Sequence, residues 1–128
     1  MKVKIGKYPN HRFYHNWLYD WFGYSPKQRT SIKIHKYDTW SMYHTLAPII
    51  LPMLVQLKAT QHGYPANLTE QEWDDILDEM IWAFEQKCRD DWMDDYDYSW
   101  DSEEAKVHQE RMTNGFKLFG TYFENLWD

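Results

Sequence analysis

The sequence predicts an α+β fold, with a small antiparallel sheet near the N-terminus packed against three or four helices and an all-helical C-terminal half. Two short segments alternate polar and apolar residues, which is typical of half-buried strands. Several longer segments repeat apolar residues at helical spacing, and most of them lie in the second half. A chain of 128 residues can enclose one modest core, so we expect a single domain spanning 1–128.

The two predicted strands are residues 2–5 and 31–35. In the first, Lys2 and Lys4 alternate with Val3 and Ile5. In the second, Ser31, Lys33 and His35 alternate with Ile32 and Ile34. If the strands pair, one face of the sheet is apolar and the other is basic. Two strands are marginal alone, so we expect a helix on the apolar face.

A short helix is predicted between the strands, over residues 10–22. Phe13, Trp17 and Trp21 recur every four residues, and Gly23 is a natural residue to end the helix. His11, His15 and Tyr19 form a neighbouring stripe with the same spacing.

A longer helix is predicted to begin after Asp38 or Thr39, either of which could cap it, and to end near Thr60. Pro48 and Pro52 each remove one backbone donor, so we expect a kink or a break there. Residues 46–57 are apolar nearly all round, which indicates a central buried helix.

The second half contains two further helical patterns. Residues 69–72, Thr-Glu-Gln-Glu, predict a capping box that opens a helix with a strong apolar stripe. That stripe comprises Trp73, Ile76, Leu77, Met80, Ile81, Phe84 and Cys88. A last helix is predicted after Asp101 or Ser102, and Gly115 and Gly120 weaken it but permit close packing.

The connector 90–101 is acidic and aromatic. Asp95-x-Asp97-x-Ser99 resembles the start of a calcium loop, but Trp100 and Lys106 stand where glycine and glutamate are needed. We therefore favour a solvated acidic connector over an EF-hand.

Charge divides the chain sharply. Residues 1–62 carry nine Lys and Arg against two acids, a net charge of +7, and five of the six histidines. Residues 63–128 carry five Lys and Arg against 18 acids, a net charge of −13. Such asymmetry bears on partners rather than on fold, although two halves of opposite charge can also simply attract each other.

Several classes of protein are disfavoured. The sequence contains no phosphate-binding glycine-rich loop, dinucleotide fingerprint, nucleophile elbow or paired-cysteine zinc site. The single cysteine, Cys88, cannot form an intramolecular disulfide and falls on a predicted core stripe, so we expect a buried, inert thiol. We see no signal peptide and no segment that could span a membrane. We expect no cofactor.

The candidate ligand-binding residues lie in the basic half, where cations, imidazoles and aromatic rings mix. Phosphate groups bind arginine and lysine, and bases stack on flat rings. We predict that a small anionic nucleotide binds there, without catalysis, through the following residues: His11, Arg12, Tyr14, His15, Lys27, Arg29, Lys33, His35, Trp40 and His44. His11 and His15 could also approach one metal ion, but we favour a polar helix face and assign no metal site.

Four stretches of the chain carry a resemblance to a known family: KIGKYPNHR (4–12), DTWSM (38–42), LDEMIWAFE (77–85) and HQERMTNGF (108–116). They resemble a small protein family of tailed bacteriophages that has no established activity. The resemblance covers most of the chain and carries no site residues. It implies a phage-encoded protein that acts in the host cytoplasm, where small phage proteins often blunt host defence.

In that context the leading hypothesis is a sponge that sequesters an anionic nucleotide immune signal. One alternative is an acidic inhibitor that occupies the nucleic-acid groove of a host enzyme. Another is a phosphodiesterase or nuclease that uses His11, His15 or His44 as acid or base. A structural part of the virion is a fourth. We expect a homo-oligomer, because the sheet is small and the aromatic surface large, and no direct DNA binding.

Overall fold

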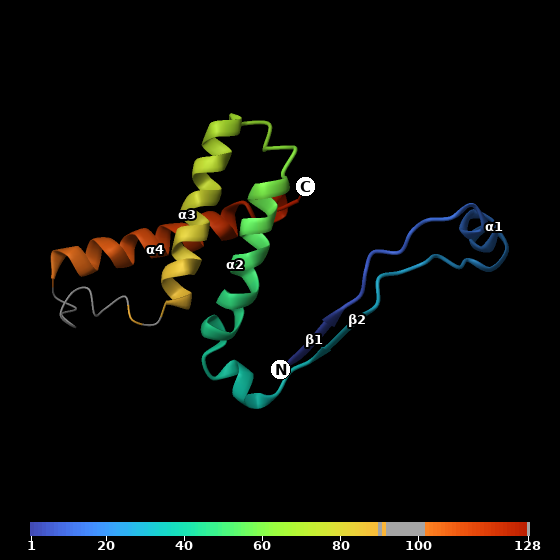
Figure 1. Ribbon diagram of the computed structural model, residues 1–128, viewed down its shortest axis with the longest axis horizontal. Coiled ribbons are helices and arrows are strands. Elements are labelled where there is room, and N and C mark those ends of the chain that lie inside the picture. Colours follow the sequence, from blue (N-terminus) through green and yellow to red (C-terminus); the bar gives the residue numbers. More distant parts are fainter. Residues whose placement is uncertain (90, 92–101, 128) are drawn as a thin grey trace. The chain divides into compact units, whose positions relative to one another are not determined.

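The computed structural model describes residues 1–89, 91 and 102–127, and it divides the chain into two compact units. We call Met1–Trp40 the N-terminal unit and Ser41–Asp128 the helical unit. The predicted fold class is confirmed: a two-stranded antiparallel sheet precedes a mostly helical second part (Figure 1). The predicted acidic connector 90–101 lies outside the described residues, apart from Asp91.

The N-terminal unit is a long hairpin. Strand β1 (Lys2–Ile5) pairs with β2 (Thr30–Lys33), and helix α1 (Phe13–Phe22) lies at the far end of the hairpin (Figure 1). Beyond the strands, the N–H of Gly6 donates to the carbonyl of Arg29 at 2.8 Å and so continues the pairing. We call the paired strands the ribbon.

The ribbon separates its side chains as the sequence predicts. Lys2 lies opposite Lys33 and Lys4 opposite Ser31, so these four share one face. The other face carries Val3 opposite Ile32 and Ile5 opposite Thr30. All eight strand residues are exposed, because α1 does not cover the ribbon within this unit.

Helix α1 begins three residues later than predicted and ends where predicted. Gly23 adopts a left-handed conformation with φ of 64°, and its N–H donates to the carbonyl of Tyr19 at 2.8 Å. A residue with a Cβ is strained in that region, so glycine is the natural residue here.

Asp38 caps a different element from the predicted one. It follows His35 in a short 3₁₀ helix, η1 (Lys36–Thr39), and accepts the N–H of His35 at 2.7 Å. Its carboxylate also binds the Met1 ammonium group at 2.9 Å. The predicted cap for the long helix is therefore wrong, and that helix, α2 (Met42–Thr60), starts after Ser41.

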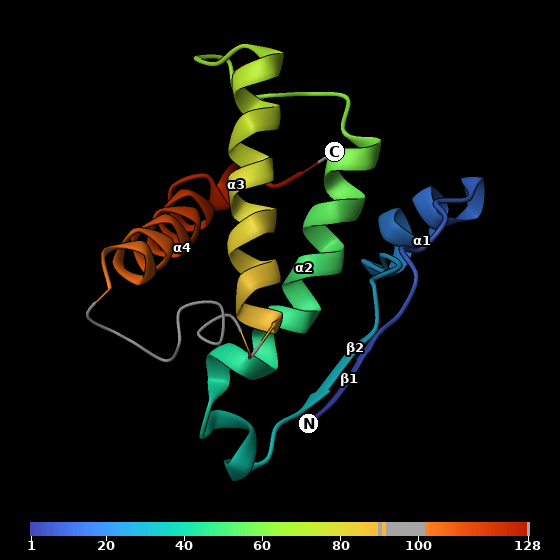
Figure 2. The same cartoon turned by 60° about the vertical axis from the view of Figure 1, so that its left-hand side comes forward.

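The helical unit consists of α2, α3 (Glu70–Cys88) and α4 (Glu103–Thr121), followed by a short 3₁₀ helix, η3 (Phe123–Asn125). Helix α3 is the central element (Figures 1 and 2). Both α2 and α4 pack extensively against it, whereas α2 and α4 hardly contact each other. The core combines Trp73, Leu77, Met80 and Phe84 of α3 with Ala47 and Leu54 of α2.

The prediction of a central buried α2 is wrong within this unit. Helix α2 runs without a break through Pro48 and Pro52 and buries only one side, around Ala47 and Leu54. Its other side is exposed and still apolar. Cys88 is also exposed rather than buried, because it lies in the last turn of α3, beyond the buried part of the helix.

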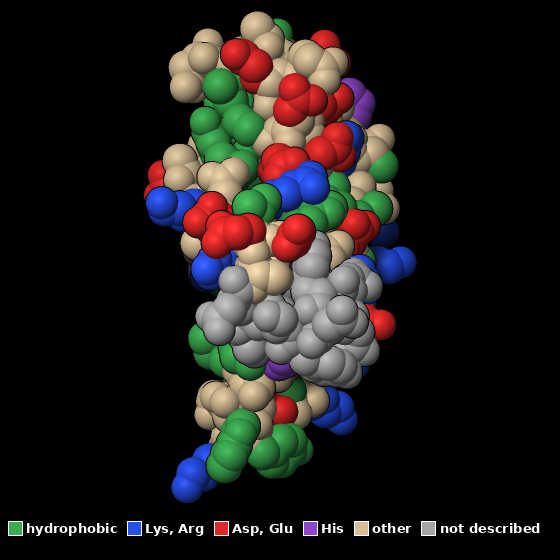
Figure 3. All heavy atoms as spheres, turned by 90° about the vertical axis from the view of Figure 1, so that its left-hand side faces the viewer, with side chains coloured by type: hydrophobic (Ala, Val, Ile, Leu, Met, Phe, Trp, Pro, Cys, Tyr) green, Lys and Arg blue, Asp and Glu red, His purple; other side chains and the backbone are tan. Residues whose placement is uncertain are grey.

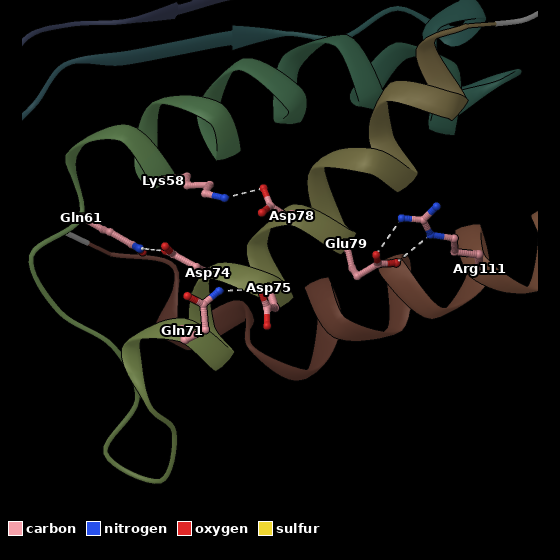
Figure 4. Close-up of polar contacts among 8 residues, drawn as sticks. All are labelled: Lys58, Gln61, Gln71, Asp74, Asp75, Asp78, Glu79 and Arg111. Carbon is pink, nitrogen blue, oxygen red and sulfur yellow. Dashed lines mark hydrogen bonds and ion pairs between the residues drawn. The ribbon is translucent and has the colours of Figure 1, made fainter.

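Polar contacts join the three helices at the surface. Figure 4 shows Lys58 of α2 paired with Asp78 of α3, and Gln61, which follows α2, bonded to Asp74. On the other side of α3, Glu79 accepts two bonds from Arg111 of α4. Exposed pairs of this kind add little to stability, so they mainly fix the register between helices.

The predicted capping box at the start of α3 is confirmed. The N–H of Thr69 donates to the Glu72 carboxylate at 2.7 Å, and the Thr69 hydroxyl accepts the N–H of Glu72 at 3.2 Å. The backbone and hydroxyl of Thr69 both donate to Glu72 and lower the pKa of its carboxyl from the usual 4.5.

This capping box gives a pH-dependent prediction. Because the folded state lowers the pKa of Glu72, its stabilising contribution is complete above pH 4.5 and is lost as the pH falls through the lowered value. We expect Glu72→Gln to lower the unfolding midpoint at pH 7 and to approach the wild type at acid pH, once the pH falls below the lowered pKa of Glu72. Urea unfolding followed by circular dichroism across this range measures the difference.

Glu70→Gln is the matched control, since Glu70 lies in the same first turn but outside the capping box. It reports the interaction of a carboxylate with the helix dipole alone. The prediction is contradicted if the unfolding midpoint of Glu72→Gln stays equally far below that of the wild type down to acid pH. It is also contradicted if Glu70→Gln lowers the midpoint by the same amount.

Candidate functional site

Four of the predicted ligand-binding residues gather at the start of α1. His11 and Arg12 precede the helix, and Tyr14 and His15 lie in its first turn. The ring centroids of His11 and His15 are 5.5 Å apart, and those of Tyr14 and His15 are 4.5 Å apart. We call these four residues the tip cluster.

His15 is the most buried residue of the N-terminal unit, at 9% exposed. Its Nδ1 accepts the backbone N–H of Arg12 at 2.8 Å, which caps the start of α1. A neutral imidazole with Nδ1 as acceptor carries its proton on Nε2. His15 therefore has a structural role in α1 that sequence reasoning did not assign.

A second group lies on the ribbon. Lys2, Lys4, Ser31 and Lys33 form what we call the basic face, and each of them is exposed. Just beyond β2, the rings of His35 and Tyr37 stack with centroids 5.4 Å apart and planes only 2° from parallel. The basic face thus carries three lysines from two strands, and the exposed pair of rings follows Lys33 along the chain.

The remaining predicted residues join neither group. Lys27 and Arg29 lie in the segment that leads into β2, and Trp40 follows η1 with its side chain 91% exposed. His44 belongs to α2 in the helical unit. The ten predicted residues are therefore distributed over the tip cluster, the ribbon, the segments on either side of β2, and helix α2 of the other unit.

The helical unit contains an apolar groove that sequence reasoning missed. It has a volume of about 430 Å³ and is lined by Met42, Tyr43, Leu46, Ala47, Ile50, Phe84, Lys87 and Phe116. The Lys87 ammonium group lies 4.2 Å from the centre of the Tyr43 ring, a cation–π contact. The signal that could have revealed it is the excess of apolar residues in α2 beyond those needed for one buried side.

A shallower hollow of about 410 Å³ lies beside Trp82, His108 and Arg111. The Arg111 guanidinium group lies 3.9 Å from the centre of the Trp82 ring, and its bonds to Glu79 raise its pKa. Because Arg111 is held by a ring and a carboxylate at once, it serves the α3–α4 contact.

The charges near the ribbon come mainly from lysine. The Met1 ammonium group and the His35 N–H both donate to Asp38 and hold the pKa of this carboxyl below its usual 3.8. Among the ion pairs between described residues, none includes Lys2, Lys4 or Lys33.

In the described part of the chain, no three His, Cys, Asp or Glu side chains are arranged to hold a metal ion.

None of the described helices is long and apolar enough to cross a membrane. Comparison of the chain with known protein families, with curated proteins and with solved structures finds no match. The function is therefore inferred from the residues themselves.

Proposed function

We propose that this protein binds an anionic nucleotide on the basic face of its ribbon and sequesters it without chemistry. The observation that carries the proposal is the cross-strand pair of Lys2 and Lys33, with Lys4 on the same face. Like charges directly opposite each other destabilise a sheet, and a bound phosphate relieves that repulsion.

Position and exposure support this proposal. The strands hold the three ammonium groups on one side, and no described carboxylate forms an ion pair with them. Lysine binds phosphate as a point charge and does not require one fixed geometry. Two or three lysines can therefore share the phosphates of one nucleotide.

The stacked rings of His35 and Tyr37 supply the second part of the site. Their parallel planes form a short aromatic stack next to Lys33 along the chain. Bases stack on such rings with little dependence on sequence. In this proposal the lysines hold the phosphates, and the His35–Tyr37 stack holds a base.

The phage context belongs to the same proposal. A protein made in the cytoplasm of an infected host could remove a nucleotide immune signal simply by binding it. Sequestration needs no catalytic group, and the proposal assigns none.

The test is calorimetric titration of the full chain with cyclic dinucleotides, cyclic trinucleotides and ADP-ribose. We expect one of these to bind, and Lys33→Met to weaken that binding by roughly tenfold or more, since a charge-assisted hydrogen bond contributes about 1.5–3 kcal/mol. Lys7→Met is the matched control, because Lys7 is exposed and lies outside the strands. Circular dichroism checks that both variants fold.

The same titration separates the alternatives. Equal losses in Lys33→Met and Lys7→Met contradict a site on the basic face, and no binding across the set overturns the proposal. Recovered ligand that has been cleaved establishes the phosphodiesterase instead. An acidic inhibitor binds none of the nucleotides and retains a host partner in a salt-sensitive pulldown.

A further inference from the structure

Helix α2 presents an apolar surface that the described residues of the helical unit leave exposed. We call Pro48, Ile49, Pro52, Met53 and Val55 the outer face of α2, and all five are exposed. Met53 is 66% exposed and Val55 47%. Helix α2 contains no Asp or Glu, whereas α3 and α4 are rich in both. A helix that is apolar all round is normally buried all round.

The ribbon presents a matching surface. Val3, Ile5 and Ile32 lie on one side of it, and we call them the apolar face of the ribbon. Ile5 is 60% exposed and Ile32 58%, and nothing in the N-terminal unit packs on them. Because two strands alone are marginal in water, this face needs a cover.

Charge favours contact between the two kinds of unit. The N-terminal unit has eight Lys and Arg against two acids, a net charge of +6. The helical unit has six Lys and Arg against 18 acids, a net charge of −12. Figure 3, which shows the side on which α4 lies in Figure 1, shows many Asp and Glu side chains there. Two N-terminal units, or two helical units, would repel each other.

We propose that the apolar face of the ribbon in one copy of this chain packs on the outer face of α2 in a second copy. Only Trp40 and Ser41 separate η1 from α2, and short hinges favour the exchange of an arm between copies. A reciprocal exchange makes the same contact twice and closes as a symmetric dimer. The basic face of the ribbon points the opposite way from its apolar face and stays open to a nucleotide.

The first measurement is sedimentation of the full chain at micromolar concentration. We expect twice the mass of the 15.8 kDa chain, with weaker association at high salt because opposite charges contribute. A monomer at these concentrations overturns the proposal.

Four single substitutions locate the interface. Ile32→Asp and Met53→Asp each place a carboxylate in the contact and should weaken dimerisation on the order of a hundredfold, given the cost of burying an unpaired charge. Ser31→Asp, on the basic face, and Val107→Asp, on the exposed side of α4, add the same charge elsewhere and should leave the dimer intact. If either control weakens dimerisation as much as Ile32→Asp does, the assignment of the interface to these two faces is wrong.

A mixture of the two disruptive variants tests exchange itself. Ile32→Asp keeps an intact outer face, and Met53→Asp keeps an intact ribbon, so mixing them restores one of the two contacts. We expect a heterodimer in the mixture and monomers of each variant alone. A Met53→Asp variant that stays dimeric points to pairing between ribbons and overturns the proposal, as does a mixture that remains monomeric.

Discussion

Replacing Gly115 by alanine is expected to destabilise the helical unit, whereas the same change at Gly120 stabilises it. A Cβ at Gly115 would collide with the Cβ of Ala83 and lie 2.7 Å from the carbonyl oxygen of Glu79, both on α3. A Cβ at Gly120 meets no atom within 4 Å. Both glycines lie in α4, Gly115 in its interior and Gly120 one residue before its end, so helix propensity favours alanine at both positions.

The magnitudes follow from two opposing effects. Alanine is favoured over glycine in a helix by about 1 kcal/mol, and Gly120→Ala should gain up to that amount. Overpacking costs ~1–3 kcal/mol, so Gly115→Ala should lose stability despite its better propensity. Urea unfolding at a fixed protein concentration measures both changes in the free energy of unfolding.

A double substitution tests the mechanism. Ala83→Gly removes one colliding atom, so Gly115→Ala should cost less stability in the Ala83→Gly background than in the wild type, while the carbonyl of Glu79 still keeps a part of the cost. If Gly115→Ala and Gly120→Ala change the free energy of unfolding in the same direction, the packing of α4 on α3 does not depend on the close approach at Gly115.

Truncating Trp73 to alanine is expected to have the largest effect of any single change in the core. Trp73 is only 2% exposed, and its ring meets Tyr122 edge to face with centroids 5.5 Å apart. It lies where α3 packs against α2 and the end of α4. Truncation of a buried tryptophan costs about 3–5 kcal/mol, a large part of the roughly 5–15 kcal/mol that stabilises a typical domain.

Trp127→Ala is the matched control, because Trp127 is 64% exposed. We expect it to change the free energy of unfolding by less than about 1 kcal/mol. Far-ultraviolet circular dichroism follows both variants without relying on tryptophan fluorescence. Similar losses at positions 73 and 127 would contradict the assignment of Trp73 to the core.

The sequence determined most of the local structure. Alternation of lysine with Val3 and Ile5 predicted β1 and both of its faces, since a period of two places successive side chains on opposite sides. Gly23 and the Thr69–Glu72 capping box predicted two helix ends, because the bonds that satisfy a helix end are made within a few residues.

The candidate site was only partly predictable. Lys33 and His35 follow from the strand pattern, but the pairing of Lys33 with Lys2 depends on the register between two distant strands. Grouping by composition could not show that His44 belongs to another unit or that His15 caps α1. Composition counts residues of a kind and carries no information on their separation in space.

What the sequence alone determined, then, is the two strands and helices α1 to α4, their order and the opposite charges of the two parts of the chain. Only the tertiary structure decided that α3 rather than α2 is central, that Gly115 and not Gly120 is a contact point, and that Cys88 is exposed. Local patterns fix which residues share a face. Which face is covered depends on residues far away in the chain. Helix α2 is apolar on two sides, so its own sequence pattern does not determine which side is buried.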